Sequence, residues 1–151
     1  IGRLLAWRLQ QTGWQITLFD KGNEHANQSA AYVAAGMLSP YAELLAGELA
    51  IFRMGQDSLA LWPQWLAQMP HSVCFQQRGS LIVAHPADES ELRQVKDIFS
   101  AKLPATTEME TINRQWLQQH EPDLNFADGL FLPQEGQIDT RQLYLHFIKF
   151  Y

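Results

Sequence analysis

The sequence predicts an α/β fold, and two observations support that prediction. Stretches with apolar residues at helical spacing alternate with short runs of β-branched and aromatic residues, and the chain contains no internal repeat or low-complexity tract. Its 151 residues are 46% hydrophobic and 18% charged, so the chain can bury a core, although it is small for an independent two-domain protein. The expected organisation is therefore a mixture of helices and strands.

Residues 1–20 read in order as a helix, a turn, a strand and an acid. Apolar residues at 4–7 and 9 give a short amphipathic helix, Thr12 and Gly13 close it, and residues 16–19 form a β-branched and aromatic strand that ends in Asp20. No capping residue precedes Gly2. This order is typical of the back half of a dinucleotide-binding βαβ unit, here expected to lack its first strand and first two glycines.

The complete motif gives a role to each end of this segment. A glycine-rich turn lets the backbone approach a pyrophosphate, and an acid roughly 20 residues further on accepts hydrogen bonds from ribose hydroxyls. Ile1 and Gly2 would lie at the turn, and Asp20 would be the acid. Because an Asp would repel a 2′-phosphate, FAD and NAD both fit the pattern. The alternative is an ordinary surface helix followed by a strand that ends in Asp.

Residues 29–43 have side chains too small for an ordinary helix and too apolar for an ordinary loop. Ala34, Ala35 and Gly36 would let backbone amides reach a flat ligand, and Gly36 can adopt a positive φ at low cost. The alternative interpretation is a tightly packed, buried turn between two helices.

These two segments together resemble the D-amino-acid-oxidase-like family of FAD oxidoreductases, through the strand followed by Asp-Lys-Gly and the run ending in Ala-Gly-Met-Leu-Ser-Pro-Tyr-Ala-Glu. The sequence is most similar to the glycine oxidase branch, of the thiamine-biosynthesis type. The resemblance implies that Asp20 binds the adenosine ribose, that Lys21 lies by the adenine, and that the run contacts the pyrophosphate, ribityl chain and isoalloxazine of FAD. Met37 would also lie close to the substrate. The cofactor residues implied in the run are Ala30, Ala31, Ala35, Gly36 and Met37, of which Ala30 and Ala31 stand where the family usually carries Ser or Thr.

Three later motifs extend the resemblance over nearly the whole chain. Arg-Gly-Ser-Leu-Ile-Val at 78–83, His-Glu-Pro at 120–122 and Gly-Gln-Ile-Asp-Thr-Arg-Gln-Leu at 136–143 occur in the family's order and rough spacing. The resemblance implies a partial FAD-binding Rossmann-like domain at 1–70 and 137–151, and part of an α+β substrate domain at 71–136.

The remaining elements are predicted from local patterns. A helical region at 43–69 is expected to be interrupted at Pro63 and to end at Pro70. Residues 73–75 and 79–84 are expected to be neighbouring strands of one sheet. Further predictions are a helix to residue 99 capped by Asp88 or Ser90, a helix over 111–117, strands at 129–132 and 136–139, and a last helix over 141–151 capped by Asp139 or Thr140.

Composition argues against several classes of protein. A formal net charge of -5 with dispersed basic residues disfavours nucleic acid as a partner. No run of 18 apolar residues could span a membrane, and residues 1–20 lack the layout of a signal peptide. The five histidines lack the spacing of a metal site. Cys74, in a Val-Cys-Phe strand, is expected to be buried and inert, and a lone cysteine favours a reducing, cytoplasmic compartment.

The resemblance implies an FAD-dependent enzyme that oxidises glycine, sarcosine or a D-amino acid to an imine by hydride transfer to the flavin. Its partners would be that small substrate, molecular oxygen as electron acceptor, and a second copy of the chain in a homo-oligomer. The Arg that pairs with the substrate carboxylate in the family would lie beyond Tyr151, so no catalytic residue is named and this segment alone is expected to be inactive.

Three alternatives stay open. An NAD-dependent dehydrogenase is supported by Asp20. A flavin dehydrogenase or a tRNA-modifying flavin oxidase would use the same cofactor domain on a different substrate. A non-enzymatic interaction module would use an exposed apolar patch around Trp62 and Trp65.

Overall fold

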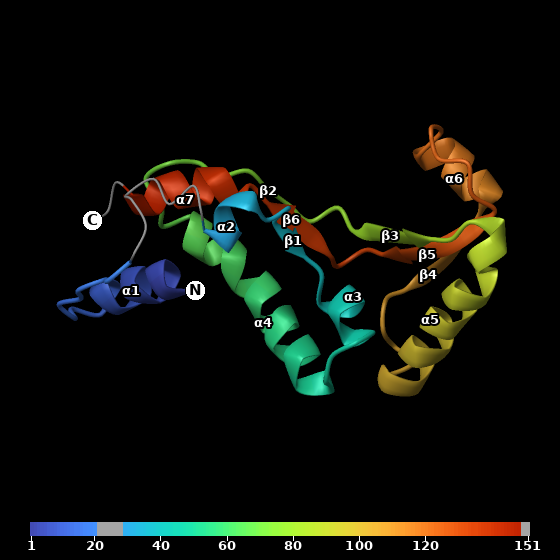
Figure 1. The fold of residues 1–151 in the computed structure, drawn as a ribbon, viewed down its shortest axis with the longest axis horizontal. Helices are drawn as coiled ribbons and strands as arrows, with labels where there is room; N and C mark the ends of the chain where they lie inside the picture. The colour runs from blue at the N-terminus through green and yellow to red at the C-terminus, as the bar shows by residue number, and fades with distance from the viewer. Residues whose placement is uncertain (21–28, 149–151) are drawn as a thin grey trace. The chain divides into compact units, whose positions relative to one another are not determined.

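The computed structural model describes residues 1–20 and 29–148, which form a mixed α/β fold as the sequence predicts (Figure 1). The chain divides into two compact units: unit 1 comprises Ile1–Met37, Pro63–Phe75 and Gln137–Tyr151, and unit 2 comprises Leu38–Trp62 and Gln76–Gly136. The helices are α1 (Gly2–Gln11), α2 (Ala30–Val33), α3 (Pro40–Leu44), α4 (Leu49–Leu66), the 3-10 turn η1 (Pro86–Asp88), α5 (Glu89–Lys102), α6 (Arg114–His120) and α7 (Thr140–Ile148).

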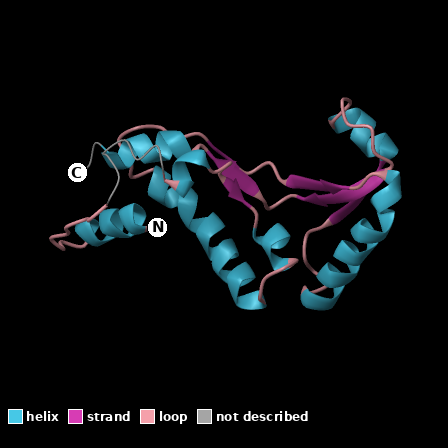
Figure 2. Cartoon of the chain, in the orientation of Figure 1, coloured by secondary structure: helices cyan, strands magenta, loops and turns pink. Residues whose placement is uncertain are grey.

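The strands form two small sheets, drawn in magenta in Figure 2. One sheet has the order β1-β6-β2, and the other has the order β3-β5-β4. In the second sheet both neighbours of β5 run antiparallel to it, with Ser80 opposite Leu132 and Ile112 opposite Gly129. The strands are β1 (Met37–Leu38), β2 (Phe75–Gln76), β3 (Ser80–Val83), β4 (Glu110–Asn113), β5 (Asp128–Leu132) and β6 (Gly136–Ile138).

The core of unit 1 forms around Trp7 of α1, which is fully buried. Trp7 packs with Met69 and with Phe147 of α7, and its ring meets the Phe147 ring edge-on at 6.4 Å. Since a buried aromatic side chain removes a large apolar area from water, this cluster is the main hydrophobic attachment of α1 to the unit. Thr12 and Gly13, which has φ +85°, end the helix as predicted.

The core of unit 2 lies between the β3-β5-β4 sheet and the helices of that unit. Alternate residues of β5 point into it, and Leu130 and Leu132 are both buried. The other buried members of this cluster are Tyr41 and Leu44 of α3, Phe52 of α4, Leu92 and Phe99 of α5, and Leu103. Helix α5 begins and ends close to its predicted bounds, but Ser90 lies inside it and Asp88, its first flanking residue, makes no side-chain cap.

The predicted strand at 16–19 is wrong, because residues 14–20 have no regular secondary structure. Trp14, Leu18 and Phe19 are exposed, Phe19 to 92%. β-branched and aromatic residues favour an extended backbone, but a strand forms only where a second strand pairs with its backbone groups. Local propensity cannot supply that partner.

Two other segments contain predicted elements in a different arrangement. The strands near 73–75 and 79–84 exist as β2 and β3, but they belong to different sheets and are not neighbours. Gly79 separates them with φ +84°, where a side chain would overlap the ring of Phe131. The helix predicted over 111–117 is half strand: β4 runs to Asn113, whose side-chain oxygen then caps α6 by accepting from the amide of Trp116 at 2.9 Å.

Pro63 does not interrupt its helix, and Cys74 is not buried. Pro63 lies within the C-terminal part of α4, where it removes one backbone donor without ending the helix. The real break in the predicted 43–69 helix falls between α3 and α4. Cys74 is exposed because alternate residues of an extended segment face opposite sides, and Val73 takes the side that packs on the core of unit 1.

Candidate functional site

No side chain caps the start of α1 at Ile1, and the first backbone hydrogen bond of the helix runs from the amide of Leu5 to the carbonyl of Ile1 at 3.0 Å. A Cβ placed on Gly2 would meet only the Leu18 side chain, at 3.9 Å. An uncapped helix start carries a partial positive charge and amide donors that point outward, which together suit a bound phosphate group.

Asp20 is held beside this helix start by Arg3. The distance from Arg3 Nη2 to Asp20 Oδ2 is 4.0 Å, and the Asp20 side chain is 52% exposed. A carboxylate near a phosphate-binding helix start can accept hydrogen bonds from sugar hydroxyls. Lys21, the predicted adenine-side residue, lies outside the described residues.

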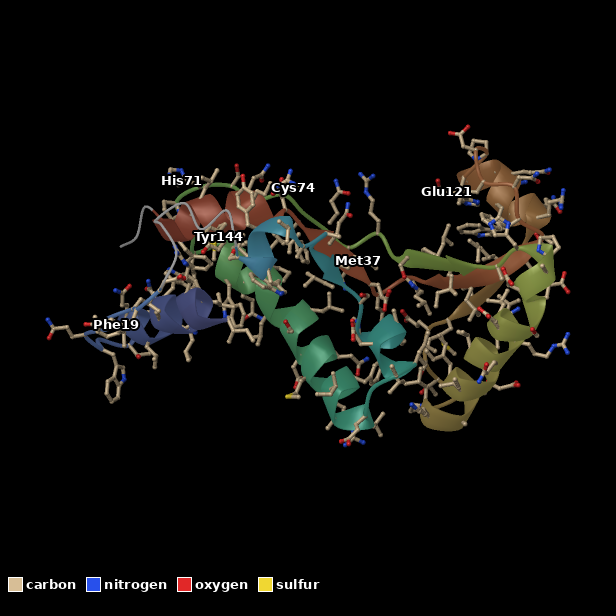
Figure 3. All side chains as sticks on the ribbon, viewed as in Figure 1. Phe19, Met37, His71, Cys74, Glu121 and Tyr144 are labelled. Atoms are coloured by element: carbon tan, nitrogen blue, oxygen red, sulfur yellow. The ribbon has the colours of Figure 1, made fainter. Side chains whose placement is uncertain are left out.

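The small-residue run is mostly exposed, so it does not form the tightly packed, buried turn that was the alternative. Ala30, Ala31 and Ala35 are exposed, and the side chain of Met37 is 61% exposed. Ser29, just before the two alanines, uses its hydroxyl to cap α2 by accepting from the amide of Tyr32 at 3.2 Å. Figure 3 shows Met37 at the start of β1, where the run enters the β1-β6-β2 sheet.

Only glycine fits at position 36, because of its backbone conformation and the closeness of the β6 backbone. Its φ is +77°, and a Cβ there would overlap the carbonyl oxygen of Ile138. The backbone of Gly36 pairs with β6, since its carbonyl accepts from the amide of Ile138 at 2.9 Å. Close contact between the two backbones therefore requires glycine, whether or not a ligand approaches the run.

Helix α7 contacts both parts of the predicted site. Thr140 donates its hydroxyl to the carbonyl of Ala34 at 3.1 Å. Asp139 caps α7, as one of the two predicted alternatives had it, by accepting from the amides of Arg141 and Gln142 at 2.9 Å each. On the next turn of α7, Tyr144 lies under the guanidinium of Arg3, 4.5 Å from its ring centre. The helix start and the run are therefore connected through α7.

Glu135 is a buried carboxylate that the sequence analysis missed. It is 1% exposed, and its Oε1 accepts from the amides of Tyr41 at 2.9 Å and Ala42 at 3.1 Å. Its Oε2 accepts from the hydroxyl of Ser80. Both amides belong to the first turn of α3, so Glu135 caps that helix from 94 and 93 residues away in sequence, a distance that no local pattern signals.

Tyr41 continues the polar network around Glu135. Its hydroxyl donates to the side-chain carbonyl of Gln134 at 2.8 Å. Burial raises the pKa of Tyr41, a hydrogen bond with Gln56 lowers it, and the negative charges of Glu108 and Glu135 raise it further. The phenol therefore stays protonated at neutral pH and acts as a donor.

Other kinds of site are absent from the part of the chain that the structure describes. Within residues 1–20 and 29–148 no cluster of His, Cys, Asp or Glu could hold a metal ion. No helix in those ranges is long and apolar enough to cross a bilayer. A cavity of about 430 Å³ in unit 2, lined by residues of α4 and of the segment 102–107, contains none of the predicted site residues.

The chain is similar to a known protein family and to several solved structures. The family model described as DAO, FAD dependent oxidoreductase, matches residues 1–149. No curated protein gives a significant match to the sequence.

Several solved structures share the fold. Glycine oxidase from Geobacillus kaustophilus superposes with a TM-score of 0.82 at 17% identity, over 98% of this chain and 40% of that protein. Glycine oxidase from Bacillus cereus ATCC 14579 gives a TM-score of 0.80 at 17% identity, over 99% of this chain and 41% of its own. Iminodiacetate oxidase from Chelativorans sp. BNC1 gives 0.77 at 15% identity, over 98% and 41%.

The chain therefore spans about two fifths of the length of these structures. At such low identity the superpositions establish the fold, whereas the family model covers nearly the whole chain. The chain belongs to the DAO family of FAD-dependent oxidoreductases.

Proposed function

We propose that this chain provides the adenosine and pyrophosphate side of an FAD site in an enzyme that oxidises a small amino acid. The substrate class is glycine, sarcosine or a D-amino acid, and molecular oxygen accepts the electrons. Membership of the DAO family and structural similarity to two glycine oxidases and an iminodiacetate oxidase support this proposal. The observation that carries it is the uncapped start of α1 with the Asp20 carboxylate beside it.

The residues of unit 1 fit the chemical groups of FAD. Amides at the start of α1, next to Ile1 and Gly2, bind the pyrophosphate, because an open helix N-terminus offers donors and positive potential. Asp20 accepts hydrogen bonds from the ribose hydroxyls. When bound, FAD supplies the hydride acceptor for the oxidation.

The small-residue run takes the other half of the cofactor. The exposed surface of Ala30, Ala31 and Ala35 offers no bulky side chain to a flat ring system. Met37, which is largely exposed, borders the place where the substrate binds. The carbonyl of Gly36 accepts a hydrogen bond from the amide of Ile138, which fixes this edge of the site to the sheet.

The proposed functional domains are an FAD-binding part at 1–70 and 137–151 and a substrate-binding part at 71–136. The compact units divide the chain differently at two segments, because residues 38–62 group with 76–136 and residues 71–75 group with 1–37, 63–70 and 137–151.

One alternative is disfavoured by burial. An interaction module needs an exposed surface at Trp62 and Trp65, but Trp62 is 8% exposed and Trp65 packs against the core of unit 1. A flavin dehydrogenase or a tRNA-modifying flavin oxidase would use the same cofactor residues on another substrate. An NAD-dependent dehydrogenase differs in its cofactor, so a ligand titration separates it from the main proposal.

Titration of the folded protein with FAD, followed by flavin fluorescence, tests the proposal. We expect saturable FAD binding, weaker or absent NAD⁺ binding, and a loss of FAD affinity in Asp20→Asn. Asp57→Asn is the matched control, because Asp57 is an exposed carboxylate of unit 2. Binding of NAD⁺ without FAD would favour the dehydrogenase, and unchanged FAD affinity in Asp20→Asn would remove Asp20 from the site.

A further inference from the structure

Arg3 lies in the first turn of α1. It is next to Gly2, the predicted pyrophosphate contact, and it pairs with Asp20, the predicted ribose contact. Its side chain is only 20% exposed, although it carries a full charge. The guanidinium carbon Cζ lies over the ring of Tyr144, 4.5 Å from its centroid, and Nη2 lies 4.0 Å from Asp20 Oδ2. A planar guanidinium can stack on an aromatic ring and pair with a carboxylate at the same time, which an ammonium group does less well.

Tyr144 extends this contact toward the small-residue run. It is 7% exposed, and its ring meets the ring of Tyr32 edge-on, with 6.4 Å between the centroids. The guanidinium of Arg141 lies 5.6 Å from the Tyr32 ring. We name these four residues, Arg3, Tyr144, Tyr32 and Arg141, the tyrosine stack. It joins α1, α7 and α2, all within unit 1.

The tyrosine stack accounts for how Asp20 is held. Residues 14–20 form no strand, so no sheet hydrogen bonds fix the backbone that leads to Asp20. The ion pair with Arg3 ties that carboxylate to α1, and the Tyr144 ring fixes the direction of the guanidinium. Because the Asp20 carboxylate is half exposed, solvent screens the ion pair, and the contact with the buried Tyr144 ring contributes to keeping the Arg3 side chain in place.

We propose that Arg3 is a positioning residue that, fixed by stacking on Tyr144, holds Asp20 for the ribose of the cofactor and couples the adenosine side of the site to α7. This inference rests on the proposed function. It assigns to Arg3 a role that acts through Asp20, so its loss weakens binding of the adenosine half of FAD and leaves binding of the flavin half unchanged.

Calorimetric titration with ADP and with FMN, as probes for the two halves of FAD, tests this role. In Arg3→Gln we expect the dissociation constant for ADP to rise about fivefold, because both the stacking and the charge pairing are lost. In Arg3→Lys the dissociation constant for ADP should rise about twofold, because lysine keeps the positive charge but lacks the planar guanidinium group. Arg3→Met removes the guanidinium but keeps a long apolar side chain, and it should match Arg3→Gln.

Arg8→Gln is the matched control, because Arg8 lies on the same helix and contacts Trp7 and Trp65 instead. It should leave both dissociation constants unchanged. ADP binding as tight in Arg3→Gln and Arg3→Met as in the unmodified protein would overturn the role of Arg3 while the proposed function stands. Equal weakening of ADP and FMN, with a lower melting temperature, would reduce Arg3 to a structural residue. Absence of ADP and FAD binding in the unmodified protein would overturn the proposed function and this inference with it.

Discussion

Replacing Glu135 with alanine tests whether one buried carboxylate holds helix α3 in unit 2. The substitution removes the acceptor for the amides of Tyr41 and Ala42 and for the hydroxyl of Ser80. A hydrogen bond to a charged group contributes about 1.5–3 kcal/mol, and loss of a helix cap costs about 1 kcal/mol. Because the three bonds share one carboxylate and are not additive, we expect a loss of about 3–5 kcal/mol in the free energy of unfolding.

Urea unfolding followed by far-UV circular dichroism measures this loss. Glu135→Gln keeps one carbonyl acceptor and should lose about half as much. Glu121→Ala is the control, because Glu121, labelled beside α6 in Figure 3, is exposed and its loss should change stability by less than about 0.5 kcal/mol. A free energy of unfolding in Glu135→Ala within about 1 kcal/mol of the unmodified protein would refute the assignment of Glu135 as the cap of α3.

Three further predictions concern unit 1. Gly36→Ala should lower the free energy of unfolding by about 3 kcal/mol, because it combines a positive φ with overlap on the Ile138 carbonyl, and an unchanged urea midpoint would contradict this. Burial and the nearby charge of His71 lower the pKa of His146 below its usual 6.5, so the folded state binds its proton less readily than the unfolded state. The free energy of unfolding should therefore decrease as the pH falls below about 6.5. Unfolding curves recorded from pH 7.5 to 5 should show a weaker pH dependence in His146→Gln, and an identical pH dependence would contradict the role of His146. The exposed Cys74 thiol should react with a disulfide reagent such as DTNB in the folded protein nearly as fast as in urea, whereas strong protection would contradict its exposure.

The helices could be predicted where apolar residues recur at helical spacing and a capping or helix-ending residue follows or precedes them. Helix α1 ends at the predicted Thr12 and Gly13, and α7 begins directly after Asp139, one of its two predicted caps. These elements satisfy their own backbone hydrogen bonds, so the local sequence determines them almost completely. Helix α5 follows the same logic.

The strands were less predictable because their partners lie elsewhere in the chain. The run at 16–19 has strong β propensity but forms no strand, while residues 111–113, predicted to be helical, belong to β4 and pair with β5. Cys74 was wrongly predicted to be buried for a related reason. Alternate residues of an extended segment face opposite sides, and the local sequence does not show which side faces the core.

The candidate site was predictable in its residue types but not in its contacts. Asp20 and Gly2 follow from the spacing of a dinucleotide motif, whereas the pairing of Arg3 with Asp20 and with Tyr144 joins segments far apart in sequence. Gly36 was predicted for its conformational freedom, and its positive φ is confirmed, but its nearest neighbour is the backbone of Ile138. Glu135 could not be recognised from the sequence, because an acid between two strands looks like an ordinary turn residue. Its role depends on α3, a helix that is distant in sequence.

Backbone amide NMR during a titration with FAD tests whether the cofactor binds at the start of α1 and at Asp20. We expect the amide resonances of Gly2, Asp20 and Gly36 to shift in a saturable way, while that of Gly129, buried in the sheet of unit 2, stays unchanged. Shifts confined to unit 2, or no saturable shift at Gly2 and Asp20 in a folded protein, would contradict binding there.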